Sequence, residues 1–252
     1  MIKLPFKRAG FSLVEITVVL FILGLILAGT ITPLSLSIDQ AQRNDAEKRI
    51  DSVETAILGF TLTNQRLPCP DCPTGTGVAA CTGNENDGIE DISAGQCILG
   101  TTNAIAGNIP WVSLGINGRD SWGRVIQYAV DAEYADTTAD TTNKLAGCTN
   151  PVTTNSFSLC SQAVITINDA GATCVGTPNA VAQSIPYIVF SHGQEESDAT
   201  STLCNELENV NGNNNFVSRD YTEDNTLYFD DLIFWGSPFI LNSQMVKAEL
   251  LP

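Results

Sequence analysis

Histidine is the scarcest functional side chain in this sequence, with His192 as the single example among 252 residues. A metal site built on a pair of histidines is therefore excluded. A catalytic His192 would need Ser191 or a nearby acid, but adjacent residues of a strand point to opposite faces. The sequence also contains no Gly-x-Ser-x-Gly and no phosphate-binding glycine loop. We therefore expect a protein that is not an enzyme.

Basic residues are also few, with 12 Lys and Arg against 28 Asp and Glu, a formal net charge of −16. Three of the basic side chains, Lys3, Lys7 and Arg8, lie in the first ten residues, and without them 9 bases face 28 acids, a net charge of −19. Nucleic-acid binding is driven by basic patches, so no nucleic-acid partner is expected. The excess carboxylates remain available for divalent cations.

Charge is almost absent from residues 11–36, where Glu15 is the single ionisable side chain. The run is long enough to span the hydrocarbon of a bilayer, and we predict a transmembrane helix over 11–36. The preceding bases favour a cytoplasmic N-terminus, which places everything after about Ser37 in the periplasm. An acid in lipid is costly, so Glu15 is a functional-site hypothesis, with an N-terminal amine as its expected partner.

The segment Arg8-Ala-Gly-Phe-Ser-Leu-Val-Glu15, followed by about 20 apolar residues, resembles the N-terminus of type IV pilins and of type II secretion pseudopilins. This resemblance implies a leader at 1–10, cleavage between Gly10 and Phe11, methylation of Phe11 and a role for Glu15 in filament assembly. The implied partners are other pilin or pseudopilin subunits, a prepilin peptidase and methyltransferase, an inner-membrane assembly platform and membrane lipid. The alternative is an ordinary signal anchor with an incidental Glu15.

The apolar pattern changes after about residue 37 to a helical stripe. This stripe predicts an amphipathic helix over 37–63 that enters an exported head at 64–252. Strands are predicted at 125–130, 163–167, 187–190 and 227–233, with a short helix at the C-terminal end. The expected fold class is α+β and pilin-like, a long helix packed on an antiparallel sheet with disulfide-rich loops. The residues of the stripe are Ala46, Ile50, Val53, Ile57 and Phe60.

Two further stretches are notable for their turn residues. Residues 64–118 are rich in Pro, Gly, Asn and Asp, and we expect disulfides to hold them. Residues 131–162 are expected to form an insertion or long loop. Between them, Asp120-Ser-Trp-Gly-Arg124 resembles the segment that enters the sheet in major pseudopilins, with Trp122 as an expected core anchor.

All eight cysteines follow the apolar run, and an even number in an oxidising compartment predicts up to four disulfides, whose pairing the sequence leaves open. The Cys69-Pro-Asp-Cys72 spacing also allows a zinc site with Cys81 and Cys97, or a redox pair, as alternatives. The remaining disulfide candidates are Cys148, Cys160, Cys174 and Cys204.

A calcium site is a further hypothesis. A strand, an acidic Gly-containing loop and a later Asp-Leu pair before a Trp resemble the calcium loop of major pseudopilins, which implies Glu195, Glu196, Asp198 and Asp231 as ligands. The alternative is a solvated acidic loop. Apart from this possible calcium ion, no cofactor is expected.

Together these features predict a pilin-like structural subunit of a type II secretion pseudopilus or a type IV pilus, and the large cysteine-rich head favours a minor subunit. It would lie in the inner membrane as a single-pass protein with a periplasmic head, or in a cell-surface filament. Two alternatives remain. One is a tip adhesin or substrate receptor, and the other is a stand-alone membrane-anchored periplasmic protein.

Overall fold

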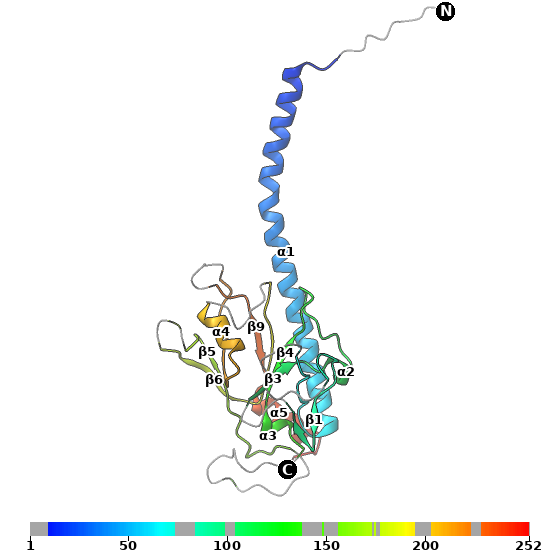
Figure 1. Ribbon diagram of the computed structural model, residues 1–252, viewed down its shortest axis with the longest axis vertical. Helices are drawn as coiled ribbons and strands as arrows, with labels where there is room; N and C mark the ends of the chain where they lie inside the picture. Colours follow the sequence, from blue (N-terminus) through cyan, green and yellow to red (C-terminus); the bar gives the residue numbers. More distant parts are fainter. Residues whose placement is uncertain are drawn as a thin grey trace, which may run out of the picture. The chain divides into compact units, whose positions relative to one another are not determined.

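The computed structural model describes residues 10–73, 84–98, 104–137, 148, 156–172, 174, 177–194, 203–222 and 228–251, and gives only the backbone of residues 27–36, 104 and 105. The chain divides into two compact units, Met1–Asn44 and Asp45–Pro252. Figure 1 shows the elements of both units.

The long helix α1 covers Leu13–Asn64 and includes Pro33 without a break. The predicted long N-terminal helix is thus confirmed. In the part of the chain that the structure describes, no helix has an apolar stretch of the length that a membrane crossing requires. The predicted membrane segment 11–36 includes residues 27–36, whose side chains lie outside the described part.

The C-terminal part of α1 belongs to the second unit and follows the predicted stripe. Ala46, Ile50, Val53 and Ile57 are all buried. One turn later the buried position is Thr61 rather than Phe60. The Thr61 hydroxyl donates a hydrogen bond of 2.7 Å to the Ile57 carbonyl, so its polar group is satisfied within the helix.

The main sheet has four antiparallel strands in the order β3 (Ala104–Asn108), β4 (Gln127–Asp131), β7 (Tyr187–Ser191) and β9 (Leu232–Trp235). Side chains alternate between its faces. Val130 and Val189 therefore share one core with the buried face of α1, whereas Ala129 and Phe190 belong to a second core. Both faces of the sheet are covered, which explains why every residue of β7 is buried.

The second core lies against a smaller sheet of β5 (Ile165–Asn168), β6 (Ala180–Ile185) and β8 (Asn215–Val217). Strand β5 pairs antiparallel with β6 but parallel with β8. The predicted antiparallel sheet is confirmed by the main sheet, whereas the parallel pair of β5 and β8 was not predicted. Strand β8 follows the helix α4 (Cys204–Val210) rather than a tight hairpin.

The remaining elements are short. A hairpin joins β1 (Ile92–Ser93) and β2 (Gln96–Cys97), and the single-turn helices α2 (Trp111–Leu114) and α3 (Ala132–Ala135) flank β4. The C-terminal helix α5 covers Pro238–Lys247 and confirms the predicted helix at this end.

Three disulfides lie within the described residues: Cys69–Cys97, Cys148–Cys160 and Cys174–Cys204. Cys72 is disulfide-bonded as well. The prediction of disulfides is confirmed. The alternatives of a zinc site or a redox pair at Cys69 and Cys72 are wrong, because Cys69 is bonded to Cys97. Cys81 lies outside the described residues.

Residues 64–118 are held by more than disulfides. The Arg66 guanidinium forms two hydrogen bonds with the Glu90 carboxylate, of 2.6 and 2.8 Å, and both side chains are largely buried. Glu90 also accepts a hydrogen bond from the Cys69 amide. The ion pair thus ties the end of α1 to the loop before β1.

Two expectations for the middle of the chain are not fully met: most of the predicted insertion or long loop at 131–162 lies outside the described residues, and Trp122 is not a core anchor. The stretch 131–162 is not simply a long loop, because α3 begins it and Phe157 is buried near its end, stacked on Tyr134 at 4.8 Å between ring centroids. Residues 138–147 and 149–155 lie outside the described part. Trp122 is only half-buried and belongs to neither core cluster.

Candidate functional site

The first candidate site is the start of α1. Gly10 and Phe11 precede the helix and are exposed, with 80 % of the Phe11 surface accessible. No heavy atom lies within 4 Å of a Cβ built on Gly10. Among the described residues, no other part of the chain therefore covers the peptide bond between them.

Ser12 and Glu15 cap the helix reciprocally. The Ser12 hydroxyl accepts a hydrogen bond from the Glu15 amide at 3.2 Å, and the Glu15 carboxylate accepts one from the Ser12 amide at 3.3 Å. This is the Ser-x-x-Glu capping box, which satisfies two amides that the first helical turn leaves open. It turns the Glu15 carboxylate back towards the N-terminal end of the helix, where Phe11 lies.

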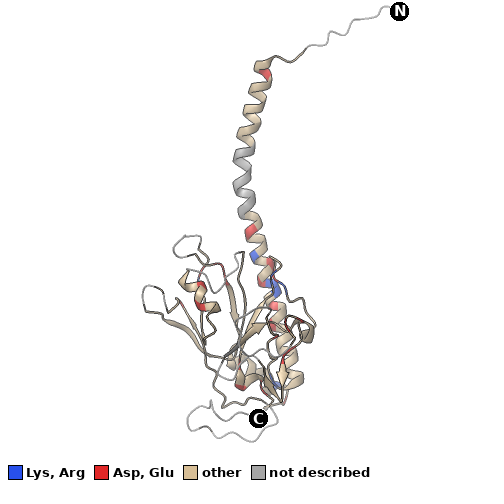
Figure 2. Cartoon of the chain, in the orientation of Figure 1, with Lys and Arg blue, Asp and Glu red and all other residues tan. Residues whose placement is uncertain are grey.

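The helix that follows is apolar on all sides and uncovered. Every large apolar side chain from Leu13 to Ile26 is 47–82 % exposed. Glu15 is the acidic residue in the first turn of α1, and Figure 2 shows acidic colour at this end of the helix. An apolar surface of this extent needs lipid or other protein to cover it.

The second candidate site lies in the head, where residues after β7 meet those before β9. Gly193 has a φ of +65°, and a Cβ there would lie 2.5 Å from the Asp230 carbonyl oxygen. The next amide, of Gln194, donates a hydrogen bond of 2.7 Å to the Asp230 carboxylate. Glycine at 193 thus allows the loop to close around Asp230.

Three acids meet at this point. One carboxylate oxygen each from Glu206, Asp230 and Asp231 lie within 4.8 Å of one another, and all three residues are buried. Asp231 is held by two neighbours: Asn209 donates to its Oδ2 at 2.6 Å, and His192 Nδ1 lies 3.1 Å from its Oδ1. We call Glu206, Asp230 and Asp231 the acidic cluster.

Burial is the main reason that the pKa of Glu206 is raised, and the charges of Asp231 and Asp230 raise it further. The cluster therefore favours a bound proton near neutral pH unless another positive charge replaces it. Carboxylate oxygens are the ligands that calcium and magnesium prefer, so the donor chemistry fits a divalent cation. Calcium takes 6–8 oxygens, and three carboxylates supply only part of this shell.

The structure brings together part of the predicted calcium site. The loop after β7 and the Asp230–Asp231 pair do meet, as the sequence pattern indicated, but Glu195, Glu196 and Asp198 lie outside the described residues. Glu206 was missed, because it lies in a short polar stretch with no strand or loop signal. The spacing of acids along a sequence does not show which of them the fold brings together.

Ser191 and His192 do not form a dyad. The Ser191 hydroxyl donates a hydrogen bond of 2.6 Å to Asp120, whereas His192 contacts Asp231. Asp120 in turn accepts from the amides of Trp122 and Arg124, so Ser191 anchors the turn that enters β4. The side chains of Ser191 and His192 thus point in opposite directions, as expected from the alternation along a strand.

Comparison with known protein families identifies the N-terminal segment. Residues 5–31 match the model of the prokaryotic N-terminal methylation motif, which is the prepilin-type signal of type IV pilins and pseudopilins. The predicted resemblance of this segment is therefore confirmed. Comparison with curated proteins gave no match. Comparison with solved structures gave none either.

Proposed function

We propose that this chain is a minor, pilin-like structural subunit of a type II secretion pseudopilus or a type IV pilus. The observation that carries the proposal is the methylation motif at residues 5–31 on a helix whose apolar side chains are uncovered. The lipid of the inner membrane covers this surface before assembly, and the helices of neighbouring subunits cover it in the filament. The work of the chain is then assembly rather than catalysis.

The geometry at the helix start supports a role for Glu15. Cleavage after Gly10 makes Phe11 the N-terminal residue and creates an ammonium close to Ser12. The capping box already holds the Glu15 carboxylate at this end of the helix. A carboxylate and an amine that meet in lipid neutralise each other, which offsets the cost of burying either charge alone. The pair forms within one subunit or between neighbours.

Two substitutions separate the charge of Glu15 from its capping role. Glu15→Gln removes the charge but keeps an oxygen that can accept from the Ser12 amide, whereas Ser12→Ala removes one capping bond and keeps the charge. We expect Glu15→Gln to reduce incorporation into filaments strongly and Ser12→Ala to reduce it less. Incorporation is measured in sheared filament fractions from a strain that lacks the wild-type subunit.

Glu47→Gln is the matched control, because Glu47 is an exposed acid on the same helix. It should assemble as the wild type does. Wild-type levels of assembly for Glu15→Gln, with the head folded in both variants, would contradict the role of Glu15.

We also propose that the head binds calcium at the acidic cluster. Three buried carboxylates within 4.8 Å support this proposal. A divalent cation would take the place of the proton that the raised pKa of Glu206 favours. It would bind residues on α4 and before β9, and so connect the two sheets of the head. This role is structural stabilisation by a ligand that binds only the folded state.

A further inference from the structure

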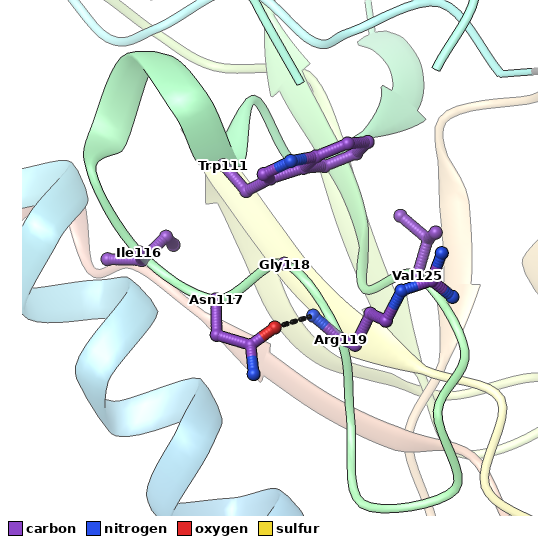
Figure 3. A pocket seen from close by; sticks show the side chains of 6 residues that line it. All are labelled: Trp111, Ile116, Asn117, Gly118, Arg119 and Val125. Atoms are coloured by element: carbon purple, nitrogen blue, oxygen red, sulfur yellow. Dashed lines mark hydrogen bonds between the residues drawn. The ribbon is translucent and has the colours of Figure 1, made fainter. Parts of the chain in front are cut away.

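A small cavity opens on the head beside α2, away in sequence from both sites described above. It has a volume of about 190 Å³. In Figure 3 the indole of Trp111 lies across one side of it, Asn117 and Arg119 lie opposite, and Ile116 and Val125 stand at the two flanks. Gly118 completes the lining. One aromatic ring thus faces two polar side chains across a space of limited size.

The indole is fixed in place by two glycines. A Cβ at Gly88 would overlap the indole, and a Cβ at Gly118 would lie 2.6 Å from the Trp111 Cβ. The backbone on either side is paired as well, because the Gly88 carbonyl accepts from the Val112 amide and the Gly118 carbonyl accepts from the Ile126 amide. A ring that is already rigid loses little entropy when a ligand stacks on it.

The polar side chains of the cavity present donors. The Asn117 side-chain oxygen accepts a hydrogen bond of 3.1 Å from the Arg119 amide, which leaves its NH₂ group for other partners. One nitrogen of the Arg119 guanidinium donates to the Gly123 carbonyl at 2.6 Å, which orients the group while its other N–H groups remain. No acidic side chain is among the six lining residues.

We propose that this cavity binds one acidic sugar ring, a uronic acid residue of a saccharide. The carbon–hydrogen face of the ring would stack on Trp111, and its carboxylate would accept hydrogen bonds from Arg119 and Asn117. A guanidinium matches a carboxylate in geometry and charge, and an aromatic side chain offers an apolar surface with a polar edge. A lining made of donors favours a carboxylate over a neutral hydroxyl, which must donate as well as accept.

The size of the cavity limits the ligand. Sites for drug-sized ligands have volumes of about 300–1,000 Å³, so this cavity accommodates one ring and not a long oligosaccharide. The rest of a chain would continue over the surface. A single ring should bind only with a dissociation constant in the millimolar range. The proposal goes beyond a purely structural subunit, because it gives the head a surface for an extracellular or cell-envelope glycan.

Saturation-transfer NMR on the full-length protein in detergent tests whether the cavity binds an acidic sugar. D-glucuronate is the probe, D-glucose is the control sugar without a charge, and N-acetylphenylalanine is the control carboxylate that resembles a peptide. We expect saturation of the glucuronate ring protons, with the strongest signals on one ring face. Arg119→Ala should weaken binding at least about tenfold, the effect of losing charge-assisted hydrogen bonds. Arg219→Ala, which removes the same charge elsewhere on the head, should leave binding unchanged.

Three results would overturn the proposal. One is absence of saturation for glucuronate at millimolar concentration. Another is equal binding by the wild type and by a folded Arg119→Ala protein. The third is stronger binding of N-acetylphenylalanine, which would assign the cavity to a peptide carboxylate instead. Asn117→Ala gives an independent check, because it should also weaken glucuronate binding. The exposed side chain of Asn117 can be shortened without disturbing the core.

Discussion

The Arg66–Glu90 ion pair should be among the most costly contacts of the head to break. Its two hydrogen bonds are 2.6 and 2.8 Å long, and the side chains are 10 % and 15 % exposed. The guanidinium also lies 5.2 Å from the centroid of the Phe60 ring. Removal of one partner leaves the other charge buried without compensation, which typically costs about 3–5 kcal/mol.

Because a small part of each side chain remains accessible, we expect Glu90→Ala to lower the free energy of unfolding by about 3 kcal/mol, near the lower end of that range. For a domain of this size that corresponds to a fall in melting temperature of about 6–12 °C. Near-UV circular dichroism during thermal unfolding, with disulfides intact, gives the measurement. The double variant Arg66→Met with Glu90→Leu should recover much of the loss, because no buried charge remains.

Asp45→Ala is the matched control. Asp45 pairs with Arg49 at 2.8 Å, but these side chains are 51 % and 36 % exposed, so the expected cost is within about 1 kcal/mol. A loss for Glu90→Ala no larger than that for Asp45→Ala would refute the reasoning from burial.

Three further perturbations have defined outcomes. Burial raises the pKa of Asp71 from 3.8 to about 6, so the folded state favours the protonated acid, and the stability of the head should decline as pH rises from 3.8 to about 6. Asp71→Asn should flatten this part of the stability profile, and an unchanged profile would contradict this role of Asp71. Gly193→Ala should destabilise the head more than Gly212→Ala. Both glycines have a positive φ, which costs an alanine about 1–2 kcal/mol, but only a Cβ at Gly193 would also clash with the Asp230 carbonyl. Equal melting temperatures of the two variants would disprove the clash. Calcium should raise the melting temperature of the head more than equal magnesium, and Glu206→Gln should abolish the difference, whereas identical curves in calcium and in chelator would exclude a calcium site.

Elements with a strong periodic pattern were predictable from sequence. The stripe on α1 has apolar residues one helical turn apart, and its buried positions Ala46 to Ile57 follow it. Strands β4 and β7 have runs of apolar residues, because the sheet is covered on both faces. Strand β3 was missed because Ala104–Asn108 contains glycine and asparagine within a turn-rich stretch, and β8 because three residues give no pattern.

Helix α4 shows most clearly where sequence reasoning ends. Asn205, Glu206, Glu208 and Asn209 are buried although all are polar. Their burial depends on distant partners: Asn205 accepts from the Gly171 amide, and Glu208 from the Ala172 amide. No local periodicity reports such contacts, so the acidic cluster was only half visible, through Asp230 and Asp231. The N-terminal motif, by contrast, is contiguous and could be read directly.

The N-terminus of the mature protein tests the central proposal most directly. Intact-mass and N-terminal peptide mass spectrometry of protein purified from its native membranes gives the answer. We expect a chain that begins at Phe11, with one methyl group on its amine, and a Gly10 variant with a bulky side chain that keeps residues 1–10. Wild-type protein that retains residues 1–10, or an unmodified chain cut at another position, would contradict the assignment as a pilin-like subunit.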